Sequence, residues 1–229
     1  MKQVLLTVSF GTSQPATLNR VEAALQRAMP HRFFYRAWMS ERLRTRENIE
    51  SPMDVLHRLD PDTDLLVVTT FLYPGREWEK LREQVFQSGL TNVRLVPPLF
   101  AWESELAQIL NTRYRNEKCP VILMGHGSDY RIFNQKLCPH IRVAALNGEP
   151  SLEAVLAEFQ PQAIVFAPLL MTAGYHARYD LAKRWKTIAE DAGCSVTCDL
   201  QGLGEWEAVR DLLVRHAKEY DHAEISDFY

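Results

Sequence analysis

Residues 121–129 read VILMGHGSD. Four apolar residues run without alternation up to Gly125, and His126 then stands between two glycines. A short unbroken apolar run is typical of a strand that is buried on both faces of a parallel sheet. Glycine lets the backbone turn sharply and lets a ligand approach closely. The stretch therefore predicts a buried strand that carries one accessible histidine at its carboxyl end.

Apolar runs of this kind alternate with helical patterns along the whole chain. We expect strands at 4–10, 33–39, 64–73, 92–100, 119–126, 142–147, 162–171 and 194–200. Between and after them, apolar residues at helical spacing predict helices at 17–29, 51–59, 76–89, 104–114, 130–138, 151–159, 176–193 and 205–220. Non-alternating strands joined by helices predict an α/β fold of parallel sheets with helices on both faces.

The two halves of the chain resemble each other. The stretch 4–13, VLLTVSFGTS, parallels 120–129, and 64–96 parallels 162–200. Aligning the glycines in these pairs sets Phe10 against His126 and Glu77 against His176. We therefore expect an internal duplication.

The duplication predicts two similar domains, 1–115 and 116–229. The charged, turn-prone stretch 112–120 is the expected linker between them. Ligands of open parallel sheets bind outside the carboxyl ends of the strands, so two such domains predict a cleft between them.

Composition excludes several classes of function. The chain has 229 residues, 46% hydrophobic and 24% charged, and a net charge of −3, which argues against binding to nucleic acid or to a membrane surface. No apolar run approaches the roughly 20 residues that span a bilayer, and MKQVLLTVSF leads into GTS rather than a cleavage site. We expect a cytoplasmic protein. Neither a P-loop nor a G-x-G-x-x-G sequence is present, so no nucleotide cofactor is expected.

His126 and His176 are the strongest candidate functional residues. Each follows a glycine-containing turn after an expected strand of the second half. A histidine there could act as a general base or ligate a metal through a neutral nitrogen. The alternatives are a ring that hydrogen-bonds a turn for His126 and a helix-start residue that packs on its neighbours for His176. Two histidines at equivalent strand ends favour a shared site.

Other candidates for ligand contacts lie mostly in the first half. Thr12 and Ser13 could hold an anion at a helix start, or simply cap the helix. Arg42 belongs to a basic segment that could face carboxylates, or could be a solvated helix. Aromatic residues near strand ends could form flat walls for a flat ligand, or could pack in the core; they are Phe10, Trp38, Phe71, Tyr73 and Tyr175.

Taken together, these motifs resemble the anaerobic sirohydrochlorin cobaltochelatase family, a branch of the class II chelatases that includes ferrochelatase. The resemblance extends over almost the whole chain. It rests on VSFGTS at 8–13, RAWMSERLR at 36–44, YPGREWEKL at 73–81, MGHGS at 124–128, PLLMTAGYHARYD at 168–180 and LQGLGE at 200–205.

The resemblance implies a two-lobed lyase that inserts a divalent metal into a tetrapyrrole of cobalamin or siroheme biosynthesis. Co2+ is the expected substrate metal, with Fe2+ or Ni2+ as alternatives. His126 and His176 would hold the metal, and one of them would accept protons from the pyrrole nitrogens. Glu77 lies in the matching stretch 73–81 and is an expected substrate contact. The sequence leaves open whether the chain forms a homo-oligomer.

The chain departs from the family pattern at two positions. Asn147 stands where the family has a glutamate, and Phe71 stands where it tends to have a histidine. Both are expected substrate contacts. Glu149, two residues after Asn147, is the expected third metal ligand; the alternative is that this chain has lost the third carboxylate. The alternative function is a protein that binds heme, another tetrapyrrole or a metal on a chelatase fold without catalysis.

Overall fold

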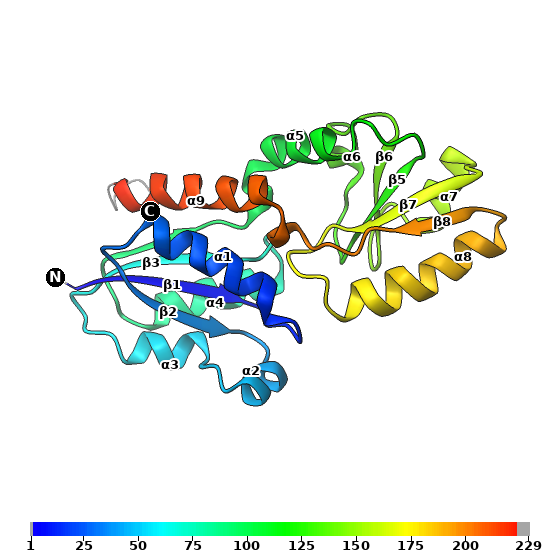
Figure 1. The fold of residues 1–229 in the computed structure, drawn as a ribbon. Helices are drawn as coiled ribbons and strands as arrows, with labels where there is room; N and C mark the ends of the chain where they lie inside the picture. The colour runs from blue at the N-terminus through cyan, green and yellow to red at the C-terminus, as the bar shows by residue number, and fades with distance from the viewer. Residues whose placement is uncertain (1, 224–229) are drawn as a thin grey trace. The chain divides into compact units, whose positions relative to one another are not determined.

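The structure, a computed structural model, describes residues 2–223. The chain divides into two compact units. Unit 1 comprises Met1–Ala101 together with the chain from Arg210 onward, and unit 2 comprises Trp102–Val209. Each unit has its own four-stranded parallel sheet with helices packed against it (Figure 1). The predicted α/β fold class is confirmed.

In unit 1 the sheet order is β2-β1-β3-β4. The strands are β1 (Gln3–Ser9), β2 (Phe33–Trp38), β3 (Asp64–Thr69) and β4 (Val93–Val96). The helices are α1 (Pro15–Ala28), α2 (Glu41–Glu47), α3 (Pro52–His57), α4 (Arg76–Gln87) and α9 (Glu207–His222), with a 3-10 turn at Leu99–Trp102.

Side chains of β1 point alternately to two covered faces, which explains its unbroken apolar run. Val4 and Leu6 share one buried cluster with Val55 of α3 and Leu81 of α4. On the other face, the Thr7 hydroxyl donates a hydrogen bond to the buried Glu22 carboxylate of α1. Helices α1 and α9 lie side by side on this second face (Figure 1).

In unit 2 the sheet order is β6-β5-β7-β8. The strands are β5 (Val121–Gly125), β6 (Ile141–Ala145), β7 (Ala163–Pro168) and β8 (Ser195–Cys198). The helices are α5 (Glu103–Arg113), α6 (Arg131–Asn134), α7 (Leu152–Phe159), the π-helix η2 (His176–Trp185) and α8 (Lys186–Asp191), with a 3-10 turn at Leu203–Glu205.

The two sheets have the same topology. In each, the first strand of the unit pairs in parallel with the second and third strands, and the fourth pairs with the third. This shared order supports the internal duplication that the sequence predicts.

The predicted domain boundary at 115/116 differs from the observed division, because the last helix of each half belongs to the other unit. Helix α5 follows the fourth strand of unit 1 but lies in unit 2. There the side chain of Asn111 accepts a hydrogen bond from the Cys138 amide at 2.7 Å and donates one to the Lys136 carbonyl at 3.0 Å. The first unit therefore ends before α5.

Helix α9 follows the strands of unit 2 but belongs to unit 1. Near its end, the buried Asp221 carboxylate accepts a hydrogen bond from Nε of Arg32 at 2.6 Å, and its carbonyl accepts one from Arg94 at 2.7 Å. Both arginines also pair with Asp64 at the start of β3. These buried ion pairs fix the helix to the first sheet.

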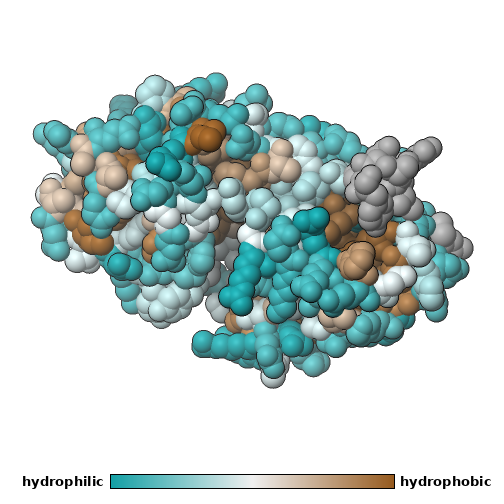
Figure 2. Space-filling model, turned by 180° about the vertical axis from the view of Figure 1, so that it is seen from behind, coloured by the Kyte–Doolittle hydropathy of each residue, from teal (hydrophilic) through white to brown (hydrophobic). Residues whose placement is uncertain are grey.

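The surface is ordinary for a globular fold. On the face shown in Figure 2, hydrophilic residues dominate and hydrophobic ones form small separate patches, in keeping with a mean hydropathy of −0.24. Among the residues that the structure describes, no helix combines the length and the apolar character that crossing a bilayer requires.

Candidate functional site

His126 is the first residue after β5, where the sequence predicts it, and its side chain is exposed. Gly125 before it must lack a side chain, because a Cβ atom there would overlap the buried ring of Tyr130. The backbone of Tyr130 is also fixed, because its amide donates a hydrogen bond to the Glu149 carbonyl at 2.7 Å. Close packing of a tyrosine on the strand end therefore sets the direction in which His126 leaves the sheet.

A second loop, which follows β6, is bonded to the His126 loop. The amide of Asn147 donates to the His126 carbonyl at 3.0 Å, and the amide of Glu149 donates to the Ser128 carbonyl at 3.0 Å. A Cβ atom at Gly148 would overlap the backbone of Ser128, so the two loops approach too closely for any other residue at this position. The backbone around His126 is thus fixed by two neighbouring strand ends.

His176 begins the π-helix η2 after β7. Its Nδ1 lies 2.7 Å from a carboxylate oxygen of Asp180. Because a carboxylate only accepts hydrogen bonds, the proton is on Nδ1, and Nε2 then carries the lone pair. A carboxylate behind a histidine is the usual way in which a metal-ligating imidazole is oriented.

The two histidines lie together. Their ring centroids are 4.6 Å apart and the rings are inclined at 72°. Neutral imidazole nitrogens bind Co2+, Fe2+, Ni2+ and Zn2+ well. The arrangement offers two nitrogen ligands to one ion at an accessible place.

Glu149 does not complete a three-ligand site. Among residues 2–223, no three histidine, cysteine or acidic side chains are grouped so that they could hold a metal ion. The Glu149 side chain is exposed. The expectation of Glu149 as third ligand thus has no support in the described geometry, and the pair alone suits an ion that is passed on rather than kept.

The electrostatics keep His126 neutral. Partial removal from water lowers the pKa of His126, the positive charge that His176 can carry lowers it further, and Asp180 opposes the shift. At pH 7 the His126 ring is therefore uncharged and can bind a metal ion without first releasing a proton.

Side chains of η2 fall into three rows with a spacing of four residues, because residues four apart lie nearly above one another in helices of this kind. The buried row packs under β7, where Trp185 meets Phe166 edge to face with centroids 5.9 Å apart. The rows are Ala177–Leu181–Trp185 (buried), His176–Asp180 (joined by the hydrogen bond) and Tyr175–Tyr179–Lys183 (exposed).

The exposed row is a ladder of two rings and a cation. Tyr175 and Tyr179 stack with centroids 4.6 Å apart, and the Lys183 ammonium lies 4.5 Å from the centre of the Tyr179 ring. The Tyr175 ring also meets His176 edge to face at 5.8 Å. Tyr175 was predicted from the sequence, but Tyr179, Lys183 and Asp180 were missed. Tyr179 and Lys183 follow Tyr175 at successive intervals of four in an expected helix, and Asp180 lies four residues after His176, which is a usable signal.

The remaining predicted residues lie in unit 1. Phe10 follows β1 directly and is half exposed. The Thr12 side chain is buried and accepts a hydrogen bond from the Gln14 amide at 3.1 Å, a local contact ahead of α1, whose N-cap residue Gln14 makes no side-chain cap. Ser13 is exposed, and so is Arg42 on α2, a helix without buried residues.

Phe71, just after the end of β3, was expected either as a wall for a flat ligand or in the core. The ring is partly buried and packs against the core of unit 1. Tyr73 is exposed and meets Phe100 edge to face at 5.4 Å. Glu77 is half-buried in the first turn of α4. Contacts of these residues with a ligand stay predictions, and so does the cleft expected between the halves.

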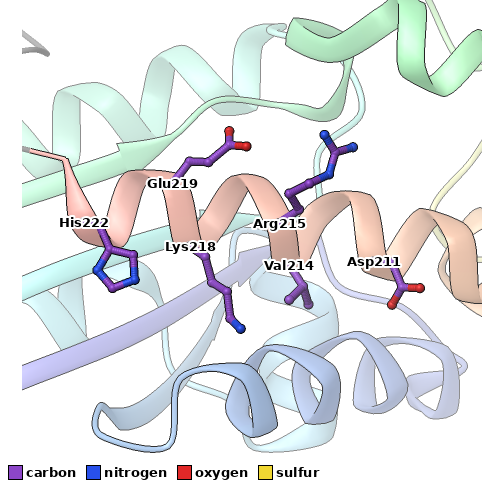
Figure 3. Close-up of a pocket in the computed structure, with 6 residues that line it drawn as sticks. All are labelled: Asp211, Val214, Arg215, Lys218, Glu219 and His222. Atoms are coloured by element: carbon purple, nitrogen blue, oxygen red, sulfur yellow. The ribbon is translucent and has the colours of Figure 1, made fainter.

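An open pocket of about 480 Å3 lies along α9 of unit 1 (Figure 3). Two acidic side chains, two basic ones, a valine and a histidine line it, and none is a predicted site residue. Arg215 and Glu219 lie on one side of the helix, and Asp211, Val214, Lys218 and His222 on the other (Figure 3). Its charges balance, so it offers no preference for an anionic or a cationic ligand.

Comparison with known proteins gives consistent matches. The model of the family described as Cobalt chelatase (CbiK) matches residues 3–221. A sirohydrochlorin cobaltochelatase from Salmonella typhimurium is 29% identical, over 94% of this chain and 95% of its own length.

Solved chelatase structures share the fold. SirB from Bacillus subtilis with Fe3+ gives a TM-score of 0.61 at 14% identity and covers 97% of this chain and 96% of its own. The sirohydrochlorin chelatase SirB from Bacillus subtilis subspecies spizizenii, in complex with cobalt, gives 0.57 at 14% identity, with 96% and 95% covered. A multi-domain protein from Deinococcus radiodurans with structural similarity to chelatases gives 0.64 at 18% identity; the match covers 96% of this chain and 55% of that larger one.

Proposed function

The chain belongs to the cobalt chelatase family, and we propose that it inserts Co2+ into sirohydrochlorin with His126 and His176 as the groups that handle the metal and the protons. The observation that carries this assignment of residues is the imidazole pair, with centroids 4.6 Å apart, in which one ring is oriented by Asp180. The Salmonella relative named as a sirohydrochlorin cobaltochelatase supports the choice of substrate. Fe2+ and Ni2+ are alternative substrate metals, because imidazole nitrogens suit all three ions and selection among them depends on geometry and metal availability rather than on affinity alone.

Metal capture uses the neutral rings. A hydrated divalent ion exchanges water for Nε2 of His176 and for a nitrogen of His126, whose lowered pKa keeps it unprotonated. Two protein ligands hold the ion less firmly than a closed four-ligand site does. The ion can therefore be transferred to the four nitrogens of the macrocycle.

Proton transfer balances the charge of the reaction. The macrocycle gains one divalent cation and loses the two protons of its pyrrole N–H groups. As the metal leaves the imidazoles, their lone pairs become free to accept these protons. Asp180 places a negative charge beside His176, so a proton accepted at Nε2 of His176 forms a compensated ion pair.

We also propose that residues of unit 1 contact the substrate. Arg42 would pair with a carboxylate of the macrocycle through its planar fork of donors. Phe10 and Tyr73 are exposed aromatic rings beside the ends of β1 and β3 and would contact the flat ring system. Thr12, Ser13, Phe71 and Glu77 complete the proposed contacts of unit 1, and Asn147 of unit 2 is a further one.

The test is metal insertion followed by absorbance. Sirohydrochlorin is mixed with Co2+, Fe2+ or Ni2+ and with the native chain, His126→Ala, His176→Ala or the control His57→Ala on α3. We expect insertion by the native chain and the control, and a loss of about 100-fold or more in the other two, the range typical for a lost general base.

The alternative function is a tetrapyrrole carrier. If the native chain binds sirohydrochlorin but none of the three metals enters above the uncatalysed rate, the proposed reaction is wrong and the carrier remains. If insertion occurs and survives both histidine changes, the reaction stands but the assignment of the residues is wrong.

A further inference from the structure

The ladder Tyr175–Tyr179–Lys183 is unusual for a surface. Tyr175 is 64% exposed and Tyr179 is 48% exposed. Their stacking buries little of either ring, and the buried row on the opposite side of η2 already anchors the helix to β7. The ladder is therefore not needed to hold the helix in place.

The ladder begins beside the metal site. Tyr175 meets the ring of His176 at 5.8 Å, and Tyr179 follows in the stack. Lys183 comes eight residues after Tyr175, at most about 12 Å along the helix axis, and folds back over Tyr179. A flat molecule whose centre lies at the histidines can thus reach an aromatic face and, further out, a cation.

The charge of this surface complements an anionic ligand. Lys183 contacts a ring in the structure, and a cation over an exposed ring is held only weakly. An arriving carboxylate can therefore replace the ring as its partner. Sirohydrochlorin combines a flat ring system with many peripheral carboxylates. Its two features match the two parts of the ladder.

We propose that Tyr175, Tyr179 and Lys183 dock one edge of the tetrapyrrole, with Tyr175 against the macrocycle and Lys183 paired with a peripheral carboxylate. The identity of the macrocycle rests on the proposed function. The geometry adds two residues, Tyr179 and Lys183, that position the substrate without touching the metal. Tyr179 lies between the other two residues: its ring stacks on Tyr175 and fixes that ring's orientation, and it positions Lys183 where the ammonium can pair with a carboxylate of the substrate.

The experiment separates binding from chemistry. KM and kcat for sirohydrochlorin are measured with Co2+ for the native chain, Lys183→Gln, Lys183→Arg and Tyr179→Ala. The matched control is Lys186→Gln, which removes a cation on the next turn that faces Glu190 at 3.7 Å. All three positions carry exposed or half-exposed side chains, and thermal unfolding verifies that each variant folds.

We expect Lys183→Gln and Tyr179→Ala to raise KM about three- to tenfold, the effect of a weak ion pair or a lost stacking contact, with kcat within about twofold of native. Lys183→Arg restores KM, and Lys186→Gln leaves it unchanged. If KM stays native in Lys183→Gln and Tyr179→Ala while the native chain inserts metal, the ladder proposal is wrong and the chelatase proposal stands.

A second measurement covers the case in which no metal is inserted. Binding of metal-free sirohydrochlorin is followed by quenching of protein fluorescence at increasing salt. Weaker, less salt-dependent binding by Lys183→Gln than by the native chain supports the ladder even if the proposed reaction fails. Equal affinity and equal salt dependence overturn it.

Discussion

Asp180 accepts a hydrogen bond from Nδ1 of His176 at 2.7 Å, and this contact makes the two histidines of the site unequal. His176 has a carboxylate that fixes its ring, whereas His126 is kept neutral by its partial burial and by His176 itself. The asymmetry suits a reaction that needs both a ligand free of protons and an acceptor for protons.

Loss of Asp180 should impair the site without unfolding the chain. Asp180→Ala frees the ring of His176 to rotate, and removal of such an orienting partner typically costs 10- to 100-fold in metal affinity or activity. Asp180→Asn keeps an acceptor oxygen for Nδ1–H and should lose less. Insertion rates at saturating substrate measure the effect, with Asp191→Asn on α8 as the control; a native rate in Asp180→Ala would contradict the orienting role.

Metal binding should persist into mildly acidic solution. Protons and Co2+ compete for the lone pair of His126, and a pKa below the ordinary 6.5 shifts this competition to lower pH. We expect the acid limb of Co2+ binding, measured by calorimetry at a series of pH values, to lie below pH 6.5. Asp180→Ala should move the limb lower still, because Asp180 opposes the shift; a midpoint above 6.5 in the native chain would refute this account.

Gly125→Ala should disturb the site more than an alanine at another glycine. The new methyl group overlaps the Tyr130 ring, and because that ring is buried and its backbone is held by Glu149, the strand end must shift. Overpacking of this kind costs about 1–3 kcal/mol, and His126 moves with the strand end. Gly75→Ala is the matched control, since nothing lies within 4 Å of its added atom. Unfolding midpoints and insertion rates of both variants measure the difference, and equal losses in the two would speak against close packing as the cause.

Asp64→Asn should destabilise unit 1 at neutral pH and have less effect in acid. Burial alone raises the pKa of Asp64, but the hydrogen bond from Arg94 and the charge of Arg32 outweigh it and leave the pKa below its ordinary 3.8. The carboxylate thus contributes stability that is present above pH 3.8 and is lost as the pH falls through the lowered value. Breaking a buried pair costs about 3–5 kcal/mol.

Urea unfolding at several pH values measures this difference in the free energy of unfolding. It should be largest near pH 7 and shrink below about pH 4. The exposed Asp62→Asn serves as the control. A difference that stays constant with pH would mean that the carboxylate charge of Asp64 does not stabilise the fold.

Local patterns predicted the elements well and their ends less well. The expected strand 92–100 stops at Val96, because Pro97 and Pro98 have no amide hydrogen to continue the ladder. The expected helix 130–138 is shortened to Arg131–Asn134. The identical order of the two sheets followed from the internal similarity of the halves, a signal that does not depend on where each element ends.

Local sequence patterns could not predict that α5 belongs to unit 2 and α9 to unit 1. Both helices are amphipathic, and an apolar stripe predicts that a helix is covered but not which sheet covers it. The pairing of Asp221 with Arg32 joins residues 189 positions apart. In the sequence, each of these residues is only a charged side chain with no indication of its partner.

At the site, glycines and strand ends identified His126 and His176, and the structure brings them together. Glu149 was expected as a third ligand from the family pattern alone, and its backbone, not its side chain, meets the His126 loop: its amide donates to Ser128. Asp180 lies inside the motif 168–180 but was not predicted as a site residue, although it is four residues after His176 in an expected helix.

The spacing of four in η2 has a consequence for how this protein can vary. The buried row, the row proposed to handle the metal and the row proposed to dock the substrate are separate stripes of one helix. On these proposals, a single substitution alters one task and spares the other two. A deletion of one residue ahead of His176 would instead rotate the helix sequence by one position and change all three rows at once. The row of His176 would then occupy the positions that the row of Tyr175 occupies now. Substitutions at 179 and 183 are thus a route by which such a chain could acquire a new macrocycle preference while its core and its chemistry are inherited intact.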